Sequence, residues 1–112
     1  MVRAEIIAEL ATSFHGNVEL GKRMIAAAAE AGADTIKTQA YDPFKINPAD
    51  PQRQWLYESW LRPEAHRQLM DEAKNCGVGY LSTPFCADSL QMLRDLGLTR
   101  FKIASTESGS DW

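Results

Sequence analysis

The chain of 112 residues is 45% hydrophobic, 24% charged and 9% aromatic, which is typical of a globular domain and excludes a disordered or fibrous chain. Its 12 basic and 15 acidic residues give a formal charge of -3 and form no block of one sign, which argues against a nucleic-acid or membrane surface. We therefore expect small molecules or other proteins as partners. Cys76 and Cys86 match no zinc or redox spacing, so a reducing cytoplasm is the expected location. We expect no targeting or anchoring segment, because no apolar run is long enough to cross a bilayer.

The first half of the chain predicts a strand, a helix and a second strand. Residues 4–11 are rich in β-branched side chains and precede the turn formers "TSFHGN", so they predict a strand. Asn17 is a good N-cap for an alanine-rich helix that ends before Gly32. Residues 33–41 mix β-branched and polar side chains in alternation, which predicts the second strand.

The second half repeats this pattern after a long connection. Residues 42–60 contain three prolines, and connections of this length are often functional. Further predicted elements follow in chain order: a helix from Pro63 to Cys76, a strand at 78–85, a helix at 87–96 and a strand at 99–105. We expect His15 on a surface loop and His66 on the solvent-facing side of its helix.

Alternating strands and helices predict a parallel sheet, either open and doubly wound or part of a barrel. Strands of an open parallel sheet read as continuous hydrophobic runs, and these do not. The period of two places Ile36 and Thr38 on one face of their strand, with Lys37 and Gln39 on the other. Polar side chains also lie near the C-terminal ends of the other strands: Glu9, Thr83 and Lys102. A TIM barrel builds its active site there, so the sequence favours an α/β fold that is a (βα)3β portion of a TIM barrel.

The end of the last strand carries further candidates. Ser105 and Glu107 differ in parity from Lys102, so a regular strand cannot point all three to one side. We expect the chain to turn near Ala104 and to place Ser105 and Glu107 on the following loop. A single lysine in a strand is more often a solvent-facing residue, but the coincidence on four strands favours a functional site.

Four segments carry a family resemblance: "IIAEL", "AAAEAGADTIKTQ", "YLSTPF" and "FKIASTE". In this order they resemble the N-terminal part of the sialic acid synthase family, the N-acetylneuraminate synthases and their relatives for other nonulosonic acids. The resemblance implies a TIM barrel followed by a small antifreeze-like domain. It also implies a carbohydrate-biosynthesis transferase that condenses phosphoenolpyruvate with an N-acylated amino sugar, such as N-acetylmannosamine, and releases phosphate. A divalent metal, Mn²⁺ or Mg²⁺, is expected for the complete enzyme, with its ligands outside this chain.

The resemblance also implies roles for particular residues. Phosphoenolpyruvate carries several negative charges, which ammonium groups in a partly desolvated pocket can stabilise. The implied roles are Lys37 and Lys102 for its phosphate and carboxylate, Thr83 and Ser105 as hydroxyl donors, Glu9 and Glu107 as catalytic carboxylates, and Gln39 and Phe85 as pocket residues.

The sequence departs from the family pattern in the loop after the first strand and near residue 110. Ser13 and Phe14 occupy the places of an Asn-His pair, with His15 one position later, and Ser110 lies near the place of an expected Asn. A complete TIM barrel takes ~250 residues, so residues 1–112 are expected to be the N-terminal half of a barrel domain. Two copies could cover each other's inner faces, which predicts a homo-oligomer.

Two other functions remain open from the residues alone. A barrel lysine, Lys37 or Lys102, could act as the nucleophile of a Schiff-base aldolase. Alternatively, the chain could be a non-catalytic half-barrel assembly module. If it is a synthase portion, we expect the isolated chain to be weakly active or inactive.

Overall fold

The computed structural model describes residues 2–112. The strands and helices predicted before residue 98 are confirmed, with ends shifted by at most three residues. Within the described residues the elements are β1 Ile7–Ala11, α1 Val18–Glu30, β2 Thr35–Ala40, the 3-10 turn η1 Pro43–Lys45, α2 Arg53–Glu58, α3 Pro63–Asn75, β3 Gly79–Pro84, α4 Ala87–Asp95 and the 3-10 turn η2 Ser105–Glu107.

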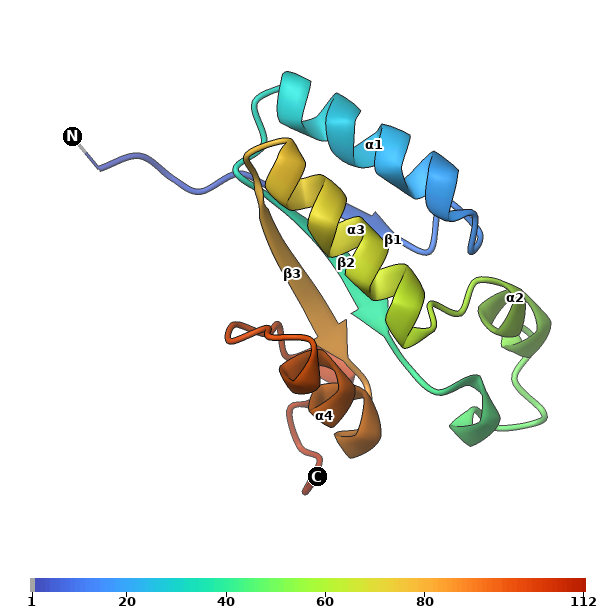
Figure 1. Ribbon diagram of the computed structural model, residues 1–112. Coiled ribbons are helices and arrows are strands. Elements are labelled where there is room, and N and C mark those ends of the chain that lie inside the picture. The colour runs from blue at the N-terminus through green and yellow to red at the C-terminus, as the bar shows by residue number, and fades with distance from the viewer. Residues whose placement is uncertain (1) are drawn as a thin grey trace.

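The strands form the predicted parallel sheet, in the order β1-β2-β3. Its register places Glu9 beside Lys37 and Gln39 beside Thr83. Helices α1 and α3 lie side by side over one face of this sheet, and α4 lies near the C-terminal end of β3 (Figure 1). The C-terminal ends of all three strands therefore meet at one edge, as the sequence predicts.

The hydrophobic core lies between the sheet and the α1–α3 pair. Its fully enclosed members come from β1, the following turn, both helices, β2 and the segment before α3: Leu10, Phe14, Ile25, Ile36, Leu61, Leu69 and Ala73. Each large aliphatic side chain in this set contributes roughly 1.5–3 kcal/mol by its burial. Ile36 and Thr38 have no exposed surface, whereas Lys37 and Gln39 on the opposite face are half-buried. This confirms the prediction that Ile36 and Thr38 lie on one face of β2 and the two polar residues on the other.

The predicted strand at 99–105 is wrong over most of its length. Only Phe101 forms a β-bridge, with Ser82, and the Lys102 N–H donates to the Ser82 carbonyl at 3.1 Å. Two contacts along one side of β3 are too few to hold a regular strand. The chain then turns after Ala104, so Ser105 and Glu107 lie in η2 as expected.

The prediction that His66 faces solvent is also wrong, because this side chain is completely buried. His66 precedes the buried Leu69 and Ala73 by three and seven residues, so all three share the core-facing side of α3. The imidazole finds a polar partner there, since its Nδ1 lies 2.9 Å from the Tyr80 hydroxyl. That partner, supplied from β3, could not be read from the helix pattern alone.

The buried imidazole belongs to a chain of polar groups between α3 and the sheet. The Tyr80 hydroxyl shares a 2.8 Å hydrogen bond with Thr38 Oγ1, which donates to Ser82 Oγ at 3.2 Å. His66 Nε2 is fully buried and has no hydrogen-bond partner among the described residues. Burial lowers the pKa of His66 to about 4, so the ring is neutral at physiological pH.

The long connection between β2 and α3 folds beyond the C-terminal end of β2 (Figure 1). It contains η1 and α2, which the sequence pattern did not predict. The turn after β1 packs closely against α2 at Gly16, where φ is +73°. A Cβ at Gly16 would lie only 2.6 Å from the Glu58 carbonyl oxygen, so glycine is required by both backbone conformation and space.

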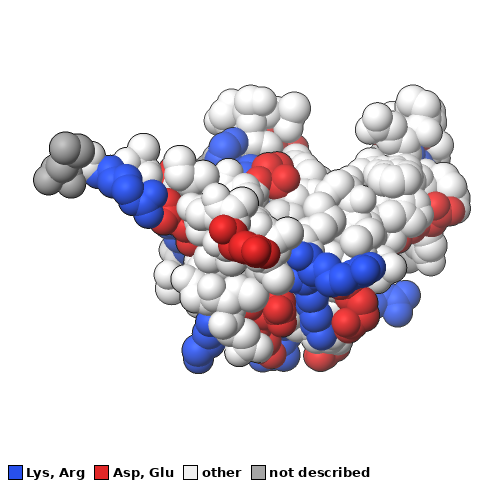
Figure 2. Space-filling model, turned by 90° about the horizontal axis from the view of Figure 1, so that it is seen from above, with Lys and Arg blue, Asp and Glu red and all other residues white. Residues whose placement is uncertain are grey.

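Basic and acidic side chains are interspersed over the face shown in Figure 2, in agreement with the sequence pattern. Within residues 2–112, no helix combines the length and apolar character needed to cross a membrane.

Candidate active site

Three adjacent strands bring Lys37, Glu9 and Thr83 together at the C-terminal edge of the sheet. Lys37 Nζ lies 3.4 Å from Glu9 Oε1 on β1 and 3.5 Å from Thr83 Oγ1 on β3. The Lys37 side chain is only 17% exposed, whereas that of Glu9 is 40% exposed. The cluster thus holds an ammonium group in a partly desolvated place with one carboxylate and one hydroxyl beside it.

The backbone of β1 is irregular next to this cluster. The register shifts between Glu9 and Ala11, so that Ala11 lies opposite Thr38. Ala11 also has a φ of 49°, in the left-handed region that residues with a Cβ rarely adopt. Bulges of this kind redirect side chains and are frequent beside active sites. The irregularity lies directly after Glu9 and marks this end of the strand.

The remaining predicted charged and hydroxyl residues lie on the segment after α4. Lys102 is exposed, and its Nζ donates to the Ile103 carbonyl at 2.7 Å. Ser105 begins η2, where its carbonyl accepts a hydrogen bond from Ser108 Oγ. The structure therefore does not place Lys102 or Ser105 in hydrogen-bond contact with the Lys37 cluster among the described residues.

Glu107 is held by residues that follow it. Its Oε2 accepts hydrogen bonds from Ser110 Oγ at 2.7 Å and from Trp112 Nε1 at 3.0 Å. These bonds, the Trp112 bond first, lower the pKa of the Glu107 carboxyl. Ser110, at a position where the family pattern has an Asn nearby, thus acts as a hydrogen-bond donor to Glu107.

Gln39 and Phe85 come together in a small cavity beyond the strand ends. Its other lining residues are Tyr41, Ile46 and Leu56. The sequence pattern does not indicate these three as site residues, although they belong to or adjoin the long connection at 42–60. The length of that connection was the available signal, but nothing in the pattern showed which of its side chains turn inward.

Phe14 and His15 both make packing contacts in the loop after β1. Phe14 is buried in the core, against Gly21 of α1. His15 is partly exposed on its loop, as expected, and its Nε2 lies 2.9 Å from a carboxylate oxygen of Glu58 on α2. Its ring also contacts Trp55 edge-on, with a centroid separation of 4.1 Å. These contacts attach the β1 loop to the long connection.

The described residues do not fit a metal centre. Within 2–112, no three His, Cys, Asp or Glu side chains gather where they could hold a metal ion. The metal requirement of a complete enzyme, with ligands outside this chain, stays a prediction.

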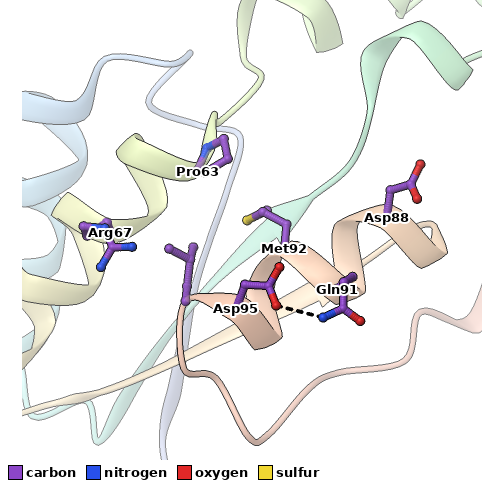
Figure 3. A pocket seen from close by; sticks show the side chains of 7 residues that line it. Pro63, Arg67, Asp88, Gln91, Met92 and Asp95 are labelled. Carbon is purple, nitrogen blue, oxygen red and sulfur yellow. Dashed lines mark hydrogen bonds between the residues drawn. The ribbon is translucent and has the colours of Figure 1, made fainter.

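A second depression lies on the outer surface between α3 and α4 (Figure 3). Arg67 lines it from α3, and Asp88 and Asp95 line it from α4, where Gln91 donates to Asp95 at 2.8 Å. None of its lining residues belongs to the cluster around Lys37, so it is separate from the candidate active site.

Comparison with known proteins identifies the family. The model of the NeuB family matches residues 24–110. The chain belongs to the NeuB family. It is 34% identical to the N,N'-diacetyllegionaminic acid synthase of Campylobacter jejuni, over 96% of this chain and 36% of that protein. It is 32% identical to a Campylobacter jejuni pseudaminic acid synthase, over 95% of this chain and 35% of that protein.

Solved structures agree with this assignment. The N-acetylneuraminic acid (sialic acid) synthetase of Leptospira borgpetersenii, solved in complex with citrate, superposes with a TM-score of 0.90 and 28% identity. The match covers 95% of this NeuB family chain and 38% of that one. The α/β fold is therefore that of a TIM-barrel portion, as predicted, and the chain spans just over a third of the length of the relatives it matches.

Proposed function

We propose that this NeuB family chain carries the phosphoenolpyruvate-binding part of a nonulosonic acid synthase. In this reaction phosphoenolpyruvate condenses with an N-acylated amino sugar, a new C–C bond forms, and phosphate is released. The observation that carries the proposal is the half-buried Lys37 ammonium, which contacts Glu9 and Thr83 where three parallel strands end. The names of the related synthases support the same class of product.

The cluster has groups suited to the substrate and to proton transfer. The Lys37 ammonium can pair with the phosphate or carboxylate of phosphoenolpyruvate and stabilise the charge that shifts as the C–O bond to phosphate breaks. The Thr83 hydroxyl can donate a hydrogen bond to the same anion. The Glu9 carboxylate can accept a proton or orient the water that attacks the former enol carbon.

The segment after α4 carries three further residues of the proposed site, Lys102, Ser105 and Glu107. Phe101 pairs with Ser82, which directly precedes Thr83, so Lys102 begins next to the strand that carries Thr83. We propose that the Lys102 ammonium leaves its own-chain contact with the Ile103 carbonyl and turns to the anion when phosphoenolpyruvate binds. Ser105 and Glu107 then supply a hydroxyl and a second carboxylate from η2.

A ligand titration tests the class of chemistry. Amide NMR signals of Lys37 and Thr83 should shift with phosphoenolpyruvate and shift much less with pyruvate, because pyruvate has the carboxylate but lacks the phosphate. Treatment with borohydride and pyruvate should leave the mass of the chain unchanged. A response to pyruvate with a trapped adduct on Lys37 or Lys102 would contradict the synthase proposal and establish Schiff-base chemistry.

We also propose that the chain assembles with a second copy. The sheet face opposite α1 and α3 carries the half-buried Lys37 and Gln39, and Ile7 is 43% exposed. Apolar and ionisable groups on such a face are commonly covered in the functional assembly. Sedimentation should show a dimer, and a monomer at every concentration would exclude this arrangement.

A further inference from the structure

The small cavity is lined by Gln39, Tyr41, Ile46, Leu56 and Phe85. Lys37 and Gln39 lie two residues apart on the same face of β2, so their Cα atoms are separated by about 7 Å. Gln39 also pairs in register with Thr83. An acceptor that reacts with a ligand bound at Lys37 therefore lies close enough to place a short substituent in this cavity.

The cavity walls are held in place by the long connection. The Tyr41 hydroxyl donates to the Leu56 carbonyl at 2.7 Å and so attaches α2 to the end of β2. Asp42 caps η1 by accepting a hydrogen bond from the Phe44 N–H at 2.9 Å. Burial raises the pKa of Tyr41 to about 12, so its hydroxyl stays a donor across the physiological range. These hydrogen bonds hold the cavity walls in place.

The chemistry of the lining selects a neutral, mostly apolar group. Four of the five lining residues are aromatic or aliphatic, and none carries a charge at neutral pH. The one amide, that of Gln39, makes no side-chain hydrogen bond among the described residues and so is available to a ligand. The volume is about 160 Å³, below the ~300–1,000 Å³ of pockets that enclose a whole small molecule. It is suited to a substituent rather than to a sugar ring.

We propose that this cavity receives the acyl methyl group of the acceptor's acylamino substituent, with the Gln39 side-chain amide hydrogen-bonded to the amide of that substituent. An acylamino group matches the lining, because it has an apolar end and a neutral amide that both donates and accepts. The inference rests on the proposed function, since it assigns a subsite for the amino-sugar acceptor. Under this assignment, Ile46 and Leu56 determine which acceptors bind.

Methyl NMR tests the proposal on the intact chain. With phosphoenolpyruvate present, N-acetylmannosamine should shift the methyl signals of Ile46 and Leu56, whereas mannose, which has a hydroxyl in place of the acetamido group, should not. The amide signals of Lys37 and Thr83 report binding at the neighbouring cluster. If N-acetylmannosamine shifts those amides and leaves both methyl signals unchanged, the subsite is wrong and the proposed function stands. If neither sugar shifts any of these signals, acceptor binding itself fails, and the subsite fails with it.

A variant with a larger side chain in the cavity wall provides a second test. Ile46→Phe should weaken N-acetylmannosamine binding at least tenfold while leaving the Kd for phosphoenolpyruvate unchanged. Ile6→Phe is the matched control, because Ile6 is 51% exposed and precedes β1 at the opposite end of the sheet. Equal N-acetylmannosamine affinities in these two variants would overturn the assignment.

Discussion

Lys37 Nζ and Glu9 Oε1 lie 3.4 Å apart on neighbouring parallel strands. An anionic ligand at Lys37 must therefore compete with the Glu9 carboxylate. We expect Glu9→Gln to tighten binding of inorganic phosphate by at most about fivefold, because a partly exposed ion pair contributes up to ~1 kcal/mol. Calorimetric titration at low salt measures this change.

The control for this prediction is Glu19→Gln. Glu19 pairs with Lys22 at 3.3 Å on the surface of α1, and neither residue contacts the Lys37 cluster among the described residues. This variant should leave phosphate affinity unchanged. Weaker phosphate binding in Glu9→Gln would mean that Glu9 orients the lysine for the ligand instead of competing with it.

The close approach of Gly16 to Glu58 predicts that two glycines of equal φ respond differently to substitution by alanine. Gly16 and Gly77 both have a φ of +73°, but a Cβ at Gly77 would meet nothing within 4 Å. Gly77→Ala should cost roughly 1 kcal/mol of unfolding free energy for the conformation alone. Gly16→Ala should cost about 2–4 kcal/mol, because the chain must also move away from Glu58. Equal losses in urea unfolding would show that the contact with α2 is not tight.

Buried His66 predicts a pH dependence of stability. Its pKa is lowered to about 4 in the folded chain from an ordinary value of 6.5, so the unfolded chain binds the proton more readily between these values. The unfolding free energy should therefore fall as the pH drops from 6.5 to 4, by about 3 kcal/mol from this group. His66→Gln should remove that component. Parallel curves for the two proteins over this pH range would contradict the assignment.

We expect Arg100 to attach the segment after α4 to the sheet. Its guanidinium donates to both carboxylate oxygens of Glu5, at 2.7 and 3.1 Å, and lies 3.4 Å from Thr35 Oγ1. Arg100→Met should accelerate hydrogen exchange of the Lys102 N–H, which bonds to the Ser82 carbonyl. Exchange in β2 should stay slow. An unchanged rate at Lys102 would mean that the Phe101 bridge alone holds this segment.

The sequence predicted the features that depend on local periodicity. The alternation in β2 correctly separated Ile36 and Thr38 from Lys37 and Gln39, and the strand ends correctly grouped Glu9 with Lys37. These predictions hold because side-chain direction in a strand follows directly from residue spacing.

Features that depend on a distant partner were missed or wrong. His66 is buried because Tyr80, on another element, supplies a hydrogen-bond partner. Residues 99–105 have strand-like composition, but a strand also needs a continuous row of backbone partners, which β3 provides here only near Phe101. Ile46 and Leu56 reach the small cavity through the folding of the long connection. That folding does not follow from any helix or strand periodicity in the sequence.

The most direct test of the proposed function is calorimetric titration of phosphoenolpyruvate into the chain and two lysine variants. Lys37→Met should weaken binding at least about tenfold, since a charge-assisted hydrogen bond contributes ~1.5–3 kcal/mol. Lys22→Met removes a lysine of α1 and should bind like the unmodified chain. Equal affinity of Lys37→Met and Lys22→Met, or no binding by the unmodified chain, would contradict the assignment of Lys37 as the phosphoenolpyruvate-binding lysine.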